Sequence, residues 1–260
     1  MGTAPALSEP RPIWHVRGTW NPRDDRRAFA VWLGVLWIGM IVGFSADFPR
    51  YLRENPAAPR VTYFHGAVFA GWLLIVTVQV LLVLKDRVAW HRKLGWFGLG
   101  WACLMAVMAP WAALASDAVN LHLPSGDEAF LSVQIVDLGG FLLLLAWGIL
   151  LRTNPAAHKR IMILATVSLA DPGFARFTQW LWPTGPNGVL PWFLWIFYGN
   201  VLLFTLMIAW DWSRGRLMPQ MVSATAGLLG AEYLASLLHS WGPWKALTLR
   251  WVQAWARSNW

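Results

Sequence analysis

Residues 62–84, TYFHGAVFAGWLLIVTVQVLLVL, decide the fold, because these 23 residues contain no lysine, arginine, aspartate or glutamate. An α-helix rises about 1.5 Å per residue, so about 20 residues cross the hydrocarbon core of a bilayer, which is about 30 Å thick. The stretch also lacks the regular alternation of a strand in a membrane β-barrel. It therefore predicts one transmembrane helix.

The rest of the chain repeats this pattern. Of its 260 residues, 57% are hydrophobic and only 13% are charged, whereas about a quarter is usual in a soluble domain. Nearly charge-free stretches of similar length lie at residues 28–46, 62–84, 94–115, 129–151, 161–181, 190–210 and 221–241. The prediction is an all-α integral membrane protein, a seven-transmembrane helix bundle over residues 28–241 that follows an N-terminal segment at 1–27.

The C-terminal segment 243–260 has a different pattern, that of an amphipathic helix. One face carries Trp244, Thr248, Trp251 and Trp255, while the opposite face carries Arg250, Gln253 and Arg257. A helix with one aromatic and one basic face is suited to lying in the membrane interface. We expect an interfacial anchor here, with a partner-binding helix as the alternative.

The distribution of basic residues predicts the orientation. Segments on the side of the N-terminus hold fourteen lysines and arginines, and those on the opposite side hold seven. The positive-inside rule then places the N-terminus in the cytoplasm and, after seven crossings, the C-terminus in the periplasm of a bacterial inner membrane. Residues 1–27 lack the short apolar core of a signal peptide, so we expect the first crossing to be a retained anchor. The net charge of +8 follows from this topology and is no sign of nucleic-acid binding.

Two histidines occupy matching places in the sequence. His91 lies in AWHRKLGW at 89–96 and His158 in AHKRIM at 157–162, each with two cations beside it and a long apolar run after it. This weak internal duplication favours two similar hairpins. The neighbouring charges favour histidines at the membrane interface, and a shared pair of ligands on the inner side is the alternative. Cys103 is the only cysteine, so neither an intrachain disulfide nor a cysteine-based zinc site is expected.

Several of these stretches form an ordered set of motifs: YFHGAVFAGW, VQVLLVLKDRVAWHRKLGWFG, RTNPAAHKRIMILATVSL and a following ARF. Over residues 61–178 the chain resembles uncharacterised bacterial multi-pass membrane proteins that carry an HG…Q…HRxLG…HKR-M pattern. The resemblance implies the family positions His65, Gly66, Gln79, His91, Arg92, Gly95, His158, Arg160, Met162 and Arg176. It implies no particular reaction.

Polar residues within the apolar stretches are the candidates for function, because an ionisable group at the centre of a span costs about 2.5–3.5 kcal/mol on insertion scales. Asp137 lies about eight residues into its span, about 12 Å deep. Counted by depth, the outer half of the bundle holds His65, Asp137, Asp171, Arg176, Glu232 and His239, with Asn200 near mid-span. Such a common layer predicts a polar site that opens toward the outer face.

Three interpretations fit this layer. In the structural one, the polar groups pair between helices. In the cofactor one, His65 and His239 ligate a haem, with haem b the candidate and Arg176 as a further cofactor-binding residue, or histidines and carboxylates surround a metal ion. In the enzymatic one, Asp137 or Glu232 acts as an acid on a lipid or isoprenoid-like substrate. No HxxxH or HExxH spacing is present, so no dedicated metal site is predicted.

We expect a redox or haem-binding membrane protein, with a lipid-directed enzyme and a cofactor-free accessory subunit as the alternatives. The partners expected are the lipid bilayer, a lipophilic ligand or quinone, and a membrane complex, with no nucleic acid. We also predict that Asp137 and Arg176 form an ion pair within the bundle, since each alone would be poorly solvated.

Overall fold

The computed structural model describes residues 22–53, 57–123 and 126–259, and the elements in these ranges are helices. They are α1 (Pro22–Tyr51), α2 (Arg60–Leu84), α3 (Val88–Asn120), η1 (Glu128–Phe130), α4 (Leu131–Leu150), η2 (Leu151–Thr153), α5 (Pro155–Val167), α6 (Asp171–Leu181), α7 (Val189–Ser213), α8 (Pro219–Ser240) and α9 (Gly242–Asn259). Most of the predicted N-terminal segment 1–27 lies outside the described residues, and α1 begins at Pro22.

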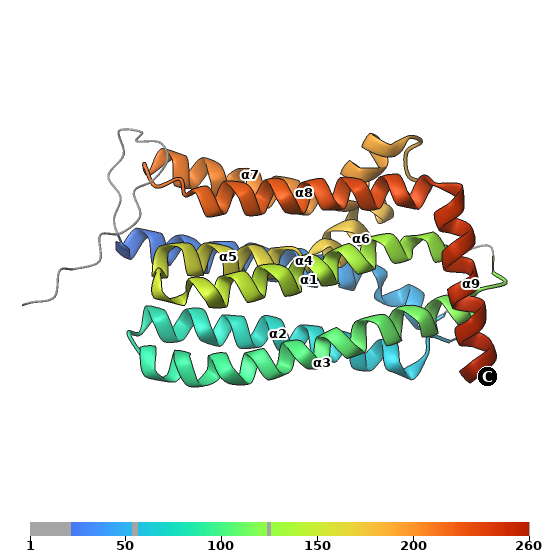
Figure 1. The fold of residues 1–260 in the computed structure, drawn as a ribbon, viewed down its shortest axis with the longest axis horizontal. Helices are drawn as coiled ribbons and strands as arrows, with labels where there is room; N and C mark the ends of the chain where they lie inside the picture. Colours follow the sequence, from blue (N-terminus) through green and yellow to red (C-terminus); the bar gives the residue numbers. More distant parts are fainter. Residues whose placement is uncertain (1–21, 54–56, 124–125, 260) are drawn as a thin grey trace, which may run out of the picture.

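The long helices run side by side along one axis, and α9 crosses them at one end (Figure 1). α2 and α3 pack together as a hairpin, α4 packs against α5 and α8, and α7 packs against α6 and α8. α1 contacts α6 most extensively and α2 less so, which joins the two halves of the bundle. The core lies between these helices and contains Leu36, Phe141 and Phe204.

The outer surface of the bundle is apolar. Large side chains such as Trp96, Leu143 and Leu150 are each more than 70% exposed. Within the described residues, six helices are long and apolar enough to cross a membrane: α1, α2, α3, α4 with its flanking turns, α7 and α8. The prediction of an all-α, multi-pass membrane protein is therefore confirmed, and lipid contact follows from the exposed apolar surface.

The fifth predicted span, 161–181, is not a single helix. α5 begins earlier, at Pro155, where the side chain of Asn154 accepts a hydrogen bond from the Ala157 amide at 3.3 Å and caps the first turn. It ends at Val167, and α6 begins at Asp171. Pro172 has no N–H to return to the carbonyl of residue 168, so the helical ladder is interrupted over 168–170. The predicted count of seven continuous spans therefore becomes six long helices and two short ones.

A charged network that the sequence did not reveal ties α1, α5 and α7 together. Arg160 is 1% exposed, and its Nε donates to Asp211 Oδ2 at 2.5 Å. Its Nη2 donates to Asp211 Oδ1 at 2.7 Å and to Asp25 Oδ1 at 3.1 Å. Lys159 also bonds Asp25. A buried guanidinium is stable only with such partners, so Arg160 fixes the relative positions of three helices.

The C-terminal helix α9 lies across the end of the bundle where α3 and α8 end, as Figure 1 shows. The Trp244 indole donates to the Ala129 carbonyl at 3.0 Å, and Thr248 and Val252 are fully buried. Trp251, predicted for the same face, is 43% exposed. An amphipathic helix is thus present, with its buried face directed onto the bundle.

Candidate functional site

Three carboxyl groups from three helices meet inside the bundle. Asp137 of α4, Asp171 of α6 and Glu232 of α8 each offer an oxygen atom, and these atoms all lie within 4.8 Å of one another. Asp171 and Glu232 are buried, and although part of Asp137 is exposed, its Oδ1 atom is buried. The sequence predicted Asp137 and Glu232 as catalytic groups, and the structure brings these two residues together.

Asn200 of α7 completes this cluster. Its amide Nδ2 donates to Asp171 Oδ2 at 2.8 Å and to Glu232 Oε1 at 2.7 Å. Both Asn200 and Glu232 are 0% exposed. The four residues, named here the acidic site, therefore join α4, α6, α7 and α8.

The acidic site is rich in acceptors without donors. Among the described residues, four of its buried oxygen atoms have no hydrogen-bond partner: Asp137 Oδ1, Asp171 Oδ1, Asn200 Oδ1 and Glu232 Oε2. A buried acceptor without a partner costs about 1–3 kcal/mol. Two unit charges 4.8 Å apart repel by about 3.5 kcal/mol at an effective dielectric constant of about 20. Three ionised carboxylates here would need compensation by a cation or by protons.

The helix break positions Asp171. This residue is the first of α6, where the free N–H groups and the positive end of the helix dipole favour a negative group. α6 also lies against α1 with backbone in contact, because a Cβ atom on Gly43 would fall 1.8 Å from the Gly173 carbonyl oxygen. This close approach requires glycine at both Gly43 and Gly173, because a side chain at either position would collide with the other helix. The contact fixes the start of α6, and with it Asp171.

The predicted ion pair between Asp137 and Arg176 is wrong. Arg176 Nε donates to Asp47 Oδ2 at 2.9 Å, and Nη2 donates to the Tyr51 hydroxyl at 2.8 Å. α6 directs Arg176 toward the end of α1, while Asp137 faces Asp171 and Glu232. The first predicted span ended at residue 46, just before Asp47, but α1 continues through Pro49 to Tyr51.

The predicted haem ligands have different surroundings. The His239 ring stacks on Trp192 with centroids 4.2 Å apart, and its Nε2 is hydrogen-bonded to Asp127 Oδ2 at 2.8 Å. The His65 ring lies against Phe69 with centroids 4.2 Å apart and the ring planes tilted by 32°. Its buried Nδ1 has no partner among the described residues. The hydrogen bond to Asp127 uses the Nε2 atom of His239, which a haem iron would otherwise need. Haem ligation by His65 and His239 stays a prediction.

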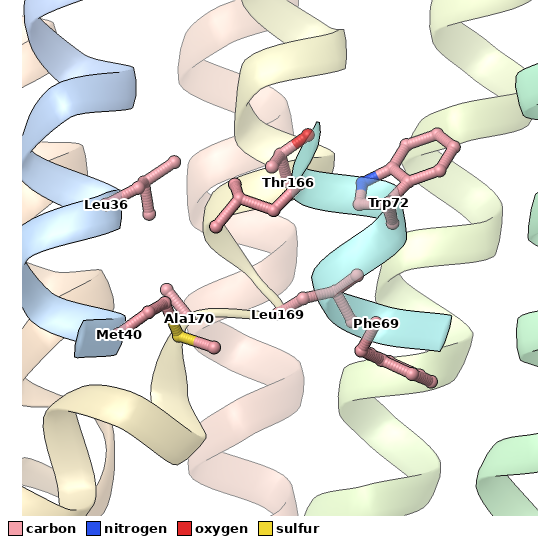
Figure 2. Close-up of a pocket in the computed structure, with 8 residues that line it drawn as sticks. Leu36, Met40, Phe69, Trp72, Thr166, Leu169 and Ala170 are labelled. Carbon is pink, nitrogen blue, oxygen red and sulfur yellow. The ribbon is translucent and has the colours of Figure 1, made fainter. Parts of the chain in front are cut away.

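A small cavity lies beside the helix break, lined by Leu36, Met40, Phe69, Trp72, Leu73, Thr166, Leu169 and Ala170. Figure 2 shows the Trp72 nitrogen on the side of Thr166. The cavity volume is about 30 Å³, enough for a water molecule, and the Trp72 Nε1 atom is buried without a partner among the described residues. The acidic residues do not line this cavity, and it is too small for a lipid chain or a haem.

Comparisons with protein families, with curated proteins and with solved structures find no match for the chain. The resemblance to uncharacterised multi-pass proteins, which is based on short motifs, therefore stays a prediction.

Proposed function

We propose that the protein is a cation-binding, multi-pass membrane protein of the ion-coupled transporter class, with the acidic site as its binding site. The observation that carries this proposal is that Asp137, Asp171 and Glu232 each offer a carboxylate oxygen within 4.8 Å of the others. Each of the three also has a buried oxygen atom without a hydrogen-bond partner among the described residues. A positive charge placed among them removes both the mutual repulsion and the loss of hydrogen bonds.

The helix break supports the same class. In many secondary transporters, ion and substrate sites form where a membrane helix is interrupted, because the broken ends expose backbone groups and dipoles to the ion. Here the interruption at 168–170 lies directly before Asp171. The α5–α6 segment serves, in this proposal, as a seventh and discontinuous crossing of a bacterial inner membrane, with the N-terminus inside.

The donor set defines the class of cation. All four candidate ligands are oxygen atoms, from three carboxyl groups and one amide, and hard ions such as Mn²⁺, Mg²⁺ and Ca²⁺ prefer oxygen ligands. Protons supply the same positive charge. For a metal ion to use Asn200 as a ligand, the amide must turn its Oδ1 toward the ion, since Nδ2 now faces Asp171 and Glu232.

The test uses the full chain in detergent and its melting temperature. Mn²⁺, Mg²⁺ and Ca²⁺ are added in turn to the wild type, to Glu232→Gln and to the control Asp86→Asn, whose carboxylate is 79% exposed at the surface. A metal site predicts a rise in the wild type and the control and none in Glu232→Gln, because a ligand that binds the folded state stabilises it.

A proton site gives a different result. No metal raises the melting temperature, but the wild type loses stability as the pH rises, since the carboxyl groups lose protons and repel one another. Glu232→Gln reduces this loss because an amide has no proton to lose. If neither metal nor pH acts through Glu232, the proposal is wrong and the cluster serves only to pack helices.

A further inference from the structure

The two histidines with matching places in the sequence, His91 and His158, lie close together in the structure, and neither belongs to the acidic site. His91 lies in the first turn of α3 and His158 in the first turn of α5. Their ring centroids are 6.3 Å apart, and the ring planes stand at 89°. Both side chains are half-buried. Residues 67 positions apart in the chain thus form a pair, as the ligand alternative required.

A backbone carbonyl defines the tautomer of His158. Its Nδ1 lies 2.7 Å from the Gly148 carbonyl oxygen, which can only accept a hydrogen bond. The proton of a neutral ring must therefore reside on Nδ1, and Nε2 keeps a free lone pair. Ligating histidines commonly donate their second nitrogen to a carbonyl in this way, which orients the ring for a metal.

His91 also has a ring nitrogen without a partner. Its Nδ1 atom is buried and makes no hydrogen bond to any of the described residues. In the tautomer protonated on Nε2, this Nδ1 atom presents a lone pair. Each of the two rings can therefore offer one nitrogen to a metal ion.

The side chain of Gln79, which belongs to α2, adds an oxygen acceptor beside the start of α3. Its Nε2 lies 3.5 Å from the position that a Cβ atom would take at Gly95, one turn after His91. Its Oε1 is buried without a partner among the described residues. This end of the bundle therefore contains two imidazole lone pairs and one amide oxygen, all acceptors that lack a donor.

We propose that His91, His158 and Gln79 bind a borderline divalent transition-metal ion such as Zn²⁺. Two imidazoles and an amide oxygen suit Zn²⁺, Cu²⁺ and Ni²⁺ better than hard ions, which separates this site from the acidic site. A fourth position stays open to water or to an exogenous ligand.

The spacing of the rings is close to what a metal needs. With a Zn–N bond of about 2.0–2.1 Å, the metal lies about 3.2 Å from each ring centroid, so two centroids in a tetrahedral site are about 5.2 Å apart. The observed 6.3 Å requires an approach of about 1 Å, which side-chain torsions can supply. Two lysines next to the histidines have partners of their own, which reduces their repulsion of a metal ion. Lys159 pairs with Asp25, and Lys93 lies 4.9 Å from the Trp90 ring centroid.

The experiment measures Zn²⁺ affinity of the detergent-purified full chain against a chromophoric chelator. His91→Ala and His158→Ala are compared with the matched control His122→Ala, a histidine exposed in a loop. We expect each of the two site variants to weaken Zn²⁺ binding at least about tenfold and the control to leave it unchanged. Gln79→Glu should strengthen binding because a carboxylate is the better ligand.

Two further measurements keep the result interpretable. The melting temperature of each variant without metal shows whether it is folded, and Cu²⁺ electron paramagnetic resonance counts the nitrogen ligands, with two expected in the wild type and one after either alanine substitution. Glu232→Gln should keep this signal, so the failure of the acidic site would leave this proposal standing. Equal Zn²⁺ affinity in folded wild type and both site variants, or a Cu²⁺ signal without two nitrogens, would overturn it and leave a water-bridged histidine pair.

Discussion

Replacing Gly43 by alanine tests whether the backbones of α1 and α6 touch. The added Cβ atom would lie 1.8 Å from the Gly173 carbonyl oxygen, and real Cβ atoms essentially never come within 3.0 Å of such an atom. The two helices must therefore separate by more than about 1 Å, a form of overpacking that costs about 1–3 kcal/mol. Alanine also favours a helix over glycine by about 0.5–1 kcal/mol, which offsets part of this loss.

The assay is thermal unfolding in detergent, followed by the intrinsic fluorescence of the 21 tryptophans. Gly34→Ala is the matched control, since a Cβ atom on this α1 residue meets nothing within 4 Å. We expect Gly43→Ala to melt about 2–10 °C below the wild type, while Gly34→Ala melts at the same temperature or slightly above it. Equal stability of the two variants would refute the close approach and, with it, the account of how Asp171 is positioned.

Three further predictions concern the charged contacts and the topology. The double variant Arg176→Ala/Asp47→Ala should lose less melting temperature than the sum of the two single variants, because the two residues form an ion pair. The losses of Arg176→Ala and Asp137→Ala should be additive. The reverse result would restore the rejected ion pair between Asp137 and Arg176. Arg160→Leu should destabilise the fold by about 3–5 kcal/mol in chemical unfolding, because buried Asp211 loses its guanidinium partner and Asp25 keeps only Lys159. A change below about 1 kcal/mol would contradict this role. A reporter fused after Trp260 should appear in the periplasm, and cytoplasmic reporter activity would show that α5 and α6 do not complete a crossing.

The continuous spans could be predicted because a single property, the absence of charge over about 20 residues, determines them. The stretch at 62–84 nearly coincides with α2, whose bounds are Arg60 and Leu84. The fifth span failed as one helix because Pro172 acts on a single hydrogen bond, which an average over 20 residues does not register. The end of α1 was misplaced because Pro49 lies inside the helix, which continues to Tyr51. Asp47 and Tyr51 in this last part of α1 are hydrogen-bonded to Arg176.

The acidic site was predicted only in part. Burial is expensive for Asp137 and Glu232, so their presence within apolar stretches was enough to identify them as candidates. Asn200, which donates hydrogen bonds to Asp171 and Glu232, could not be assigned to them from the sequence. Contact depends on how each helix is rotated about its axis, and hydrophobicity on all sides of a span hides that rotation. The same uncertainty produced the wrong partner for Arg176.

The interrupted α5–α6 segment has a consequence for how the chain is assembled in the membrane. α5 has 13 residues and is about 20 Å long, so it cannot cross a hydrocarbon core of about 30 Å by itself. Its Arg160 needs Asp211, and Asp171 of α6 needs Asn200, yet both of these partners belong to α7 and are synthesised later. We therefore expect residues 155–181 to reach their final depth in the membrane only after α7 has been made, so that the order of burial differs from the order of translation.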